Sequence, residues 1–334
     1  MRQLLSLLFL ISLPCIAQTS HRDSVRELRH QQLVQLDQLL AERRNNGSFD
    51  TNYIQRPRQP FTFKVRSNIS GSSFNVKGAI RDTDIKTKLS ADHKVTFSLG
   101  VNYRGITAGI ALNPASLSGR NKDYEVNLNA YSNRYGFDVV YQMSKSFTGT
   151  THFGETDYIM GKGVVDMKMI TVNGYYAFNG RRFSYPAAFS QSYIQRSSAG
   201  SWLVGFSYLG GRLKAGEKAR EALINNRVYV GYFGLGGGYG YNLVVRRKWL
   251  FHLSALPTVV VNNLNNVKID GERRDMRTNF PSLILAERAA IVRTFNDKYF
   301  AGATMIMTNS LLDDNQLDIN YRKWRMRLFF GWRL

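Results

Sequence analysis

The stretch Lys323–Leu334, which reads KWRMRLFFGWRL, decides the fold class of this chain. Apolar side chains occupy every second position from residue 324 onward, and basic residues such as Arg325 and Arg327 stand between them. A period of two residues is that of a β-strand with one apolar and one polar face, because successive side chains point to opposite sides. A helix would place its apolar residues three or four positions apart. The stretch therefore predicts a long amphipathic strand.

The same period recurs along the chain from Phe61 onward. It is visible in four further segments, 61–66, 97–103, 124–130 and 249–255. Strands of about 9 to 11 residues with this alternation are typical of transmembrane β-barrels. Soluble β-sandwiches and lipocalin-like barrels alternate in the same way, so they remain the alternative. The aromatic-rich apolar face of the last stretch resembles the terminal strand of bacterial outer-membrane barrels and favours the transmembrane interpretation.

We predict an all-β fold, a transmembrane antiparallel barrel of about 12 strands (range 10–14) with a short N-terminal periplasmic helix. Tight connections alternate with long ones, as short periplasmic turns alternate with long external loops in such barrels. The expected strands are 61–69, 93–103, 105–112, 123–132, 135–145, 164–178, 200–212, 227–243, 248–262, 281–295, 298–310 and 318–334. The expected long loops are 70–92, 113–122, 146–163, 213–226, 263–280 and 311–317. This topology requires residues 179–199 to form a long periplasmic excursion, either a cap on the mouth or a plug in the lumen.

The composition excludes several classes of protein. The chain has 334 residues, 45 Lys and Arg against 24 Asp and Glu, and a formal net charge of +21. Its aromatic content of 13% argues against long disorder, and its single cysteine cannot build a disulfide scaffold. No apolar run approaches the ~20 residues of a membrane-spanning helix. We expect no nucleic-acid partner, because the basic residues are scattered along the strands instead of clustering.

The N-terminus predicts export. Residues 1–17 combine Arg2, the apolar stretch Leu4–Leu13 and small residues around Ala17, which is the pattern of a signal peptide. Residues 18–60 are expected to hold a periplasmic amphipathic helix, at 21–44, and a linker, because apolar residues there recur at helical spacing. Residues 61–334 are the expected barrel, in the outer membrane. The helix either packs on its own chain or binds a periplasmic partner.

Charged residues on membrane strands are expected to face the lumen, because a cation at the bilayer centre costs about 2–4 kcal/mol. The basic residues placed there are Lys64, Arg66, Lys168, Arg325 and Arg327. The carboxylates placed beside them are Glu125, Asp138, Asp166 and Glu287. One interpretation is an internal network of ion pairs that fills a closed barrel, which is the simpler one because partly buried charges are usually paired. The other is a positive lumen that attracts small anionic solutes.

The four tryptophans are expected at the two membrane interfaces, where indole rings are favoured. Trp202, Trp249 and Trp332 fall at periplasmic strand ends in the expected topology. Trp324 precedes Trp332 on the same strand by about 20 Å along the membrane normal, so it falls near the opposite interface. These rings form the expected aromatic girdle, with outer-membrane lipid as the partner.

His252 and Ser254 lie two positions apart on the inward face of the expected strand 248–262. A serine beside a histidine is part of a hydrolase triad, but the sequence identifies no third member. His252 is therefore the catalytic candidate, and a polar pair facing the lumen is the alternative. We expect no cofactor and no metal, because Gly231–Gly240 does not match the nucleotide-binding fingerprint and residues 313–318 lack the glycine and glutamate of a calcium loop.

Two further stretches carry a resemblance to a known family. They are FSYPAAFSQSYIQRSSAGSW at 183–202 and GYFGLGGGYGYNL at 231–243, together with the Gln-Thr start at residues 18–19. The chain resembles an uncharacterised Bacteroidetes family of outer-membrane-type β-barrels, a domain of unknown function, over about residues 20–334. The resemblance implies the barrel fold and brings no established activity or catalytic residue.

These features predict a non-enzymatic outer-membrane barrel, a narrow channel or a structural barrel with a basic lumen. One alternative is a membrane-embedded enzyme that modifies lipid or glycan, with His252 in its site. The other is a surface-binding barrel that acts through the external loops 70–92, 146–163 and 263–280.

Overall fold

The computed structural model describes residues 49–80, 83–103, 106–112, 114, 123–216, 227–269, 272–276, 279–314 and 317–334, together with Gln31, Val34 and Gln35. The chain divides into two compact units, Met1–Ser48 and Phe49–Leu334. The three described residues of the first unit are helical. The expected signal peptide 1–17 and the rest of the expected helix 21–44 lie outside the described residues. No helix of the described residues is long and apolar enough to span a membrane.

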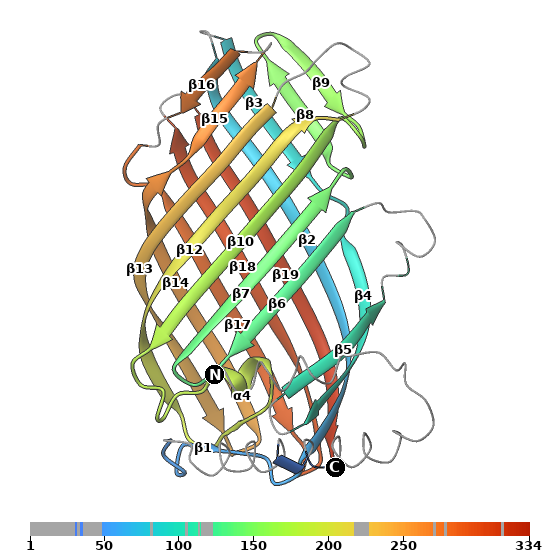
Figure 1. The fold of residues 1–334 in the computed structure, drawn as a ribbon, viewed down its shortest axis with the longest axis vertical. Helices are drawn as coiled ribbons and strands as arrows, with labels where there is room; N and C mark the ends of the chain where they lie inside the picture. Colours follow the sequence, from blue (N-terminus) through green and yellow to red (C-terminus); the bar gives the residue numbers. More distant parts are fainter. Residues whose placement is uncertain are drawn as a thin grey trace. The chain divides into compact units, whose positions relative to one another are not determined.

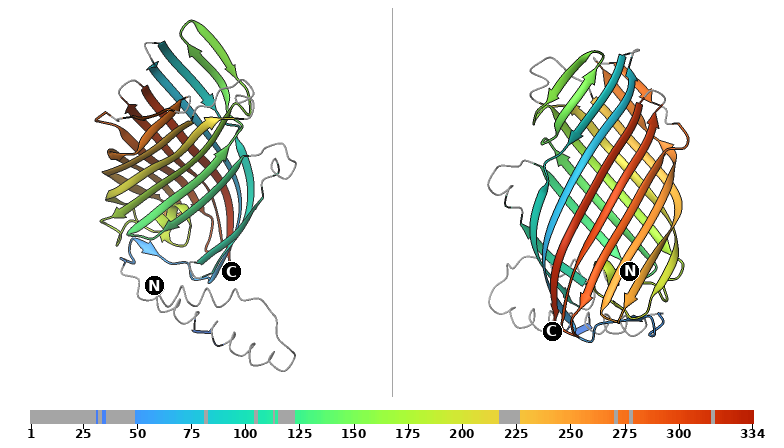
Figure 2. Two further views of the ribbon diagram at one scale, coloured as in Figure 1. Left: turned by 45° about the horizontal axis from the view of Figure 1, so that its top comes forward. Right: turned by 180° about the vertical axis from the view of Figure 1, so that it is seen from behind.

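The second unit is a curled antiparallel sheet, as the alternating sequence predicts (Figures 1 and 2). Twelve strands of the described chain form its wall, and each overlaps one of the expected strands. They are β2 (Phe61–Ile80), β4 (Lys94–Tyr103), β5 (Ile106–Leu112), β6 (Tyr124–Tyr131), β7 (Tyr135–Ser144), β10 (Val165–Ala177), β12 (Ala199–Ala215), β13 (Arg227–Val245), β14 (Trp249–Asn263), β17 (Leu283–Thr294), β18 (Tyr299–Asp314) and β19 (Leu317–Arg333). Antiparallel ladders join them in one series, β6-β7-β10-β12-β13-β14-β17-β18-β19-β2-β4-β5. The predicted fold class is confirmed.

Burial alternates along the wall and separates an inner from an outer face. On β19 the side chain of Arg325 is 8% exposed, whereas that of Leu328 is 62% exposed. Tyr321, Lys323 and Phe329 share the inner face with Arg325. The outer face carries Trp324, Met326, Leu328, Phe330, Trp332 and Leu334, which are the alternating apolar positions of the C-terminal stretch Lys323–Leu334.

One end of the sheet carries β-hairpins, and we call it the hairpin end (Figure 1). Its strands are β3 (Thr83–Ser90), β8 (Thr148–Phe153), β9 (Thr156–Met160), β15 (Asn265–Ile269) and β16 (Glu272–Met276). The segments 70–92, 146–163 and 263–280 were expected to be loops, and they contain these strands. The expected long loop 311–317 is wrong, because the β18–β19 ladder continues to the pair Asp314 and Leu317. Residues 115–122 and 217–226, expected as loops, lie outside the described residues.

The opposite end carries the tight connections, and we call it the turn end. β6 and β7 are joined by residues 132–134, β13 and β14 by Arg246–Lys248, and β17 and β18 by residues 295–298. These connections fall where the expected strands 123–132 and 135–145, 227–243 and 248–262, and 281–295 and 298–310 follow one another closely. Arg246 and Arg247 have φ angles of 51° and 54°, in the left-handed region that glycine and asparagine favour.

Residues 179–198, which we call the plug segment, fold into the turn end between β10 and β12. The segment contains α4 (Tyr185–Phe189) and β11 (Ile194–Gln195), which pairs with β1 (Ile54–Gln55). Ser184 caps α4, since its hydroxyl accepts a hydrogen bond from the Ala187 amide, and proline at the first turn suits the helix start. All five α4 residues are buried.

The plug segment shares a hydrophobic core with the inner face of the wall. Its buried members, including Phe183, Tyr185 and Phe189, pack in one cluster with inner residues of six strands. Those inner residues are Tyr175, Ala177, Ala199, Leu203, Leu250, Leu256, Ala286, Ala290, Val292, Phe300 and Phe329. The long excursion expected at 179–199 is therefore a plug inside the lumen and adds no strand to the wall.

Candidate functional site

The candidate site is the lumen, whose inner face carries most of the charged residues that the sequence singles out. Lys64 is 5% exposed and Arg325 8% exposed, and Arg66 and Arg327 lie on the same inner face of β2 and β19. Neighbouring inner positions of these two strands therefore bring four cations together. These four cations alternate with the apolar outer residues of the two strands, Phe63 and Val65 on β2 and Met326 and Leu328 on β19.

Three of the charged residues expected in the lumen lie elsewhere. Asp166 and Lys168 alternate with the buried Met167 and Met169, so they occupy the outer face of β10. The Lys214 ammonium pairs with the Asp166 carboxylate at 3.2 Å. Both charges precede the apolar outer positions that begin at residue 170, and they lie toward the hairpin end. The expectation that this pair faces the lumen is wrong because β10 continues beyond its apolar stretch.

Glu287 also faces outward. It alternates with the buried Ala286 and Arg288 on β17, and its cross-strand neighbours are Ala255 and Met307. Apolar residues occupy both faces of β17, so alternation alone cannot decide which of Glu287 and Arg288 points inward. The inward residue is Arg288, which sequence reasoning missed.

A polar network fills the middle of the lumen. Arg288 on β17 donates to the Asp138 carboxylate on β7 through Nε at 3.1 Å and Nη2 at 2.6 Å. Asn129 and Tyr131 on β6 also donate to Asp138. These contacts bridge strands that are far apart in the ladder series, so they cross the lumen. The Arg288 and Asp138 side chains are 1% and 3% exposed.

A second acidic centre lies nearer the hairpin end. The Lys323 ammonium is 2.7 Å and the Lys94 ammonium 3.7 Å from the Glu125 carboxylate. Further cross-lumen bonds join Asn173 to Thr308 and Gln142 to Ser72. Part of the inner charge is therefore paired, as the ion-pair interpretation expects.

The cations nearer the plug segment lack such partners. Among the described residues no carboxylate forms an ion pair with Lys64, Arg66, Arg325 or Arg327. Arg325 and Arg327 instead bind the amide oxygens of Asn129 and Asn68 at 3.2 and 2.6 Å. The Lys64 ammonium donates to the Ser190 carbonyl and to the Gln191 amide oxygen of the plug segment. The lumen is therefore most positive where the plug segment meets β2 and β19.

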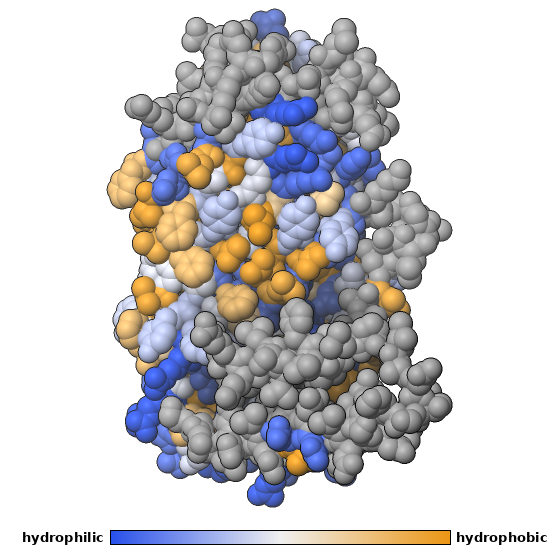
Figure 3. Space-filling view, viewed as in Figure 1, coloured by the Kyte–Doolittle hydropathy of each residue, from blue (hydrophilic) through white to orange (hydrophobic). Residues whose placement is uncertain are grey.

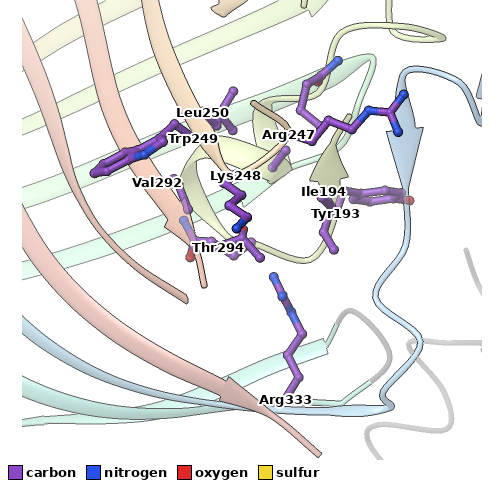
Figure 4. A pocket seen from close by; sticks show the side chains of 12 residues that line it. Tyr193, Ile194, Arg247, Lys248, Trp249, Leu250, Val292, Thr294 and Arg333 are labelled. Carbon is purple, nitrogen blue, oxygen red and sulfur yellow. The ribbon is translucent and has the colours of Figure 1, made fainter. Parts of the chain in front are cut away.

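A pocket opens beside the plug segment at the turn end (Figure 4). Its cavity volume is about 20 Å³, and its lining includes Arg247, Lys248 and Arg333 but no carboxylate. Figure 4 shows the Lys248 and Arg333 side chains pointing toward one another. Arg333 is 2% exposed, and its Nε and Nη1 atoms have no hydrogen-bond partner among the described atoms. Its guanidinium lies 4.4 Å from the ring centre of Phe300.

His252 is buried at the inner face beside the plug segment. Its Nδ1 lies 2.7 Å from the Asn242 side-chain oxygen, and its Nε2 lies 3.0 Å from the Ser254 hydroxyl. Sequence reasoning missed Asn242 as the partner of His252, because Asn242 belongs to β13 and only the strand register places it opposite His252. Among the described residues, no group of three His, Cys, Asp or Glu side chains is placed to hold a metal ion.

The outer face carries an apolar surface with aromatic side chains toward the turn end. Figure 3 shows apolar side chains across the middle of the visible wall, with hydrophilic side chains toward the hairpin end. Trp202 is 70% exposed and contacts Tyr239, Trp332 stacks on Phe63, and Trp249 stacks on Phe251. Trp324 lies further along β19 and contacts the ring of His93.

Comparison with known proteins identifies a family and several solved structures of partly similar shape. The family model described as "Domain of unknown function (DUF4421)" matches residues 48–334. The chain is similar to the outer membrane protease OmpT from Escherichia coli, with a TM-score of 0.43 and 5% identity over 83% of this chain and 97% of that chain. It is also similar to the translocator domain of the autotransporter NalP from Neisseria meningitidis, with a TM-score of 0.35 and 9% identity over 95% and 100% of the two chains. No curated protein matches the chain.

Proposed function

The chain belongs to the DUF4421 family, a domain of unknown function, and from this premise we propose that it is an outer-membrane barrel whose basic, plugged lumen admits small anionic solutes. The single observation that carries the proposal is the group of inward cations beside the plug segment, for which the described residues supply no carboxylate partner. In this proposal the turn end, with its short connections, faces the periplasm, and the hairpin end faces the exterior.

Membrane insertion is supported by the outer face. On β19 the outer positions from Trp324 to Leu334 are all apolar, and Arg322 follows them toward the hairpin end. This span is about the 9–11 residues that a tilted strand needs to cross a bilayer. Indole and phenyl rings are favoured at the boundary of lipid and water, and Trp202, Trp249 and Trp332 gather toward the turn end. The wall therefore has the pattern of a lipid-facing barrel.

Preference for anions is supported by the balance of inner charges. The inner face of the wall carries Lys64, Arg66, Lys94, Arg288, Lys323, Arg325, Arg327 and Arg333, and within the described part of the chain the carboxylates that form ion pairs with any of them are Glu125 and Asp138. A pore lined by one sign of charge attracts and selects the opposite sign. Lys248 and Arg333, which line the small pocket, add further positive charge where the lumen opens at the turn end.

The plug segment makes this lumen closed at rest. Its aromatic side chains fill the turn end, and Lys64 binds two of its oxygen atoms. A solute can pass only when the segment shifts, so we expect low conductance for the wild type. Replacing Lys64 with alanine removes both contacts and loosens the segment.

The proposal is tested by conductance of the purified protein in planar bilayers. We expect Lys64→Ala to conduct more than the wild type and to select anions over cations in a potassium chloride gradient. Arg325→Glu combined with Arg327→Glu in this background adds two inward negative charges and should reverse the selectivity. The control is Arg322→Glu, which makes one such replacement on the exposed outer face of β19, half the charge change of the double variant, and should leave selectivity unchanged.

Two results would contradict the proposal. The first is cation selectivity of the loosened barrel. The second is the absence of conductance at every voltage in both the Lys64→Ala protein and a protein whose plug segment carries Tyr185→Ala and Phe189→Ala, which would favour a purely structural barrel.

A further inference from the structure

Asn242, His252 and Ser254 form a hydrogen-bonded chain on the inner face of two neighbouring strands. His252 and Ser254 are successive inner residues of β14, and Asn242 is the register partner of His252 on β13. The three side chains are 3% exposed or less. The order is hydroxyl, imidazole and amide, with each bond within normal hydrogen-bond length.

The surrounding bonds determine which imidazole nitrogen carries the proton. The Asn242 amide nitrogen donates to the Ser184 carbonyl and to the Gln195 side-chain oxygen, both at 3.0 Å. The Gln195 orientation is fixed in turn, since its own nitrogen donates to the carbonyls of Arg182 and Ser197. The Asn242 oxygen therefore faces His252 and can only accept. His252 must be protonated on Nδ1, and the lone pair on Nε2 accepts from the Ser254 hydroxyl.

This is the arrangement of an activated nucleophile. A base within hydrogen-bond reach of a serine hydroxyl, held in the correct tautomer by a third group, is the common feature of serine hydrolase triads on unrelated folds. The sequence supplies the serine and the histidine, and the strand register supplies the orienting amide.

A cationic donor stands on the next strand. Arg288 is the register partner of Ser254 on β17 and shares its inner face. Two of its nitrogens bind Asp138, while Nη1 is buried without a hydrogen-bond partner among the described atoms. A free donor beside the nucleophile is suited to stabilise the negative oxygen of a tetrahedral intermediate.

The plug segment covers this group. The ring centroids of Tyr185, Phe189 and Phe183 lie 4.9, 5.1 and 5.9 Å from that of His252. A substrate reaches Ser254 only when these rings move, so the site is closed in the structure described.

We propose that Ser254, His252 and Asn242 form a latent acyl-transfer site for small carboxylic esters, exposed when the plug segment shifts. Ser254 Oγ attacks the ester carbonyl carbon and its proton passes to His252 Nε2. That proton then passes to the leaving alkoxide, which departs as an alcohol and leaves the acyl group on Ser254. Water attacks the acyl carbon, gives a proton to His252, and releases the carboxylic acid as the proton returns to Ser254. Asn242 is a positioning residue, and Arg288 faces the developing oxyanion.

The test uses the full-length protein in detergent micelles, a fluorophosphonate probe and p-nitrophenyl acetate. Two variants open the cover, Phe189→Ala alone and Tyr185→Ala with Phe189→Ala, and folding is checked by gel mobility without heating. We expect covalent labelling at Ser254 and ester hydrolysis in the opened proteins, with much weaker labelling of the wild type. His252→Ala in the opened background should lower kcat by roughly a hundredfold or more, the range of general-base catalysis.

Asn242 is tested by a readout that a packing role would not affect. Asn242→Leu should lower kcat with little change in KM, and Asn242→Asp should retain activity because a carboxylate holds the same tautomer. The matched control is Ser207→Ala, since Ser207 is another buried inner serine and its hydroxyl donates to Asn173 instead of a histidine. Its rate and labelling should not change.

Two results would overturn the inference. One is a folded, opened protein that is neither labelled at Ser254 nor active on the ester. The other applies to the wild type and needs no variant: nitrogen NMR of the His252 ring that finds the proton on Nε2 in place of Nδ1. Neither result depends on conductance, so the inference and the proposed anion pathway can fail separately.

Discussion

At the residue scale, some charged side chains of the lumen form ion pairs with one another and others do not. Arg288 and Asp138 are almost fully buried and make a two-bond contact, and Glu125 is shared by two lysines. A buried charge without its partner is strongly destabilising, whereas replacing both partners together is often tolerated. Single and double substitutions of Arg288 and Asp138 should therefore differ measurably in their effect on the free energy of unfolding.

Arg288→Ala and Asp138→Ala should each destabilise the barrel by about 3–5 kcal/mol, because each leaves one buried charge unpaired. The double variant should lose clearly less than the sum of the two single losses. The measurement is urea unfolding of the protein in lipid vesicles, followed by tryptophan fluorescence. Lys162→Ala is the control, since Lys162 and Asp92 form an exposed pair whose loss should cost less than about 1 kcal/mol. Additive losses in the double variant would argue against a direct pair across the lumen.

At the element scale, two segments of the turn end differ from those of a simple barrel, which has no segment folded into its lumen and unstrained turns between its strands. The plug segment occupies the lumen, and the connection between β13 and β14 places two arginines in the left-handed backbone region. That conformation costs each non-glycine residue about 1–2 kcal/mol. Arg247 also lines the pocket beside the plug segment, together with Lys248 and Arg333. The strained backbone at Arg247 therefore lies next to a group of positively charged side chains.

Replacing Arg246 with asparagine and Arg247 with glycine should therefore stabilise the barrel by about 1–2 kcal/mol, because these residues suit two-residue hairpin turns. The midpoint of urea unfolding should rise relative to the wild type. Lys298→Asn is the control in the neighbouring turn, where the non-glycine residues have no positive φ. A fall in the midpoint of the double variant would mean that the two arginine side chains stabilise the fold by more than the backbone strain costs.

At the scale of the whole molecule, the sequence predicts the wall well because one physical pattern repeats along it. All twelve expected strands are found, since a period of two residues and the tight turns are local signals. The inner or outer placement of Asp166, Lys168 and Glu287 was wrong, because β10 extends past its apolar stretch and β17 is apolar on both faces. Asn242 and the buried contacts of Lys64 depend on register and on the plug segment, which no local pattern encodes.

Gel mobility of the fractionated protein most directly tests the proposal that the chain is a β-barrel embedded in the outer membrane. Such barrels resist detergent until heated, so the folded and the boiled protein should migrate differently. We expect the protein in the outer-membrane fraction, with a faster band before heating that shifts on boiling. A protein recovered in the soluble periplasmic fraction, with one mobility before and after heating, would contradict the account.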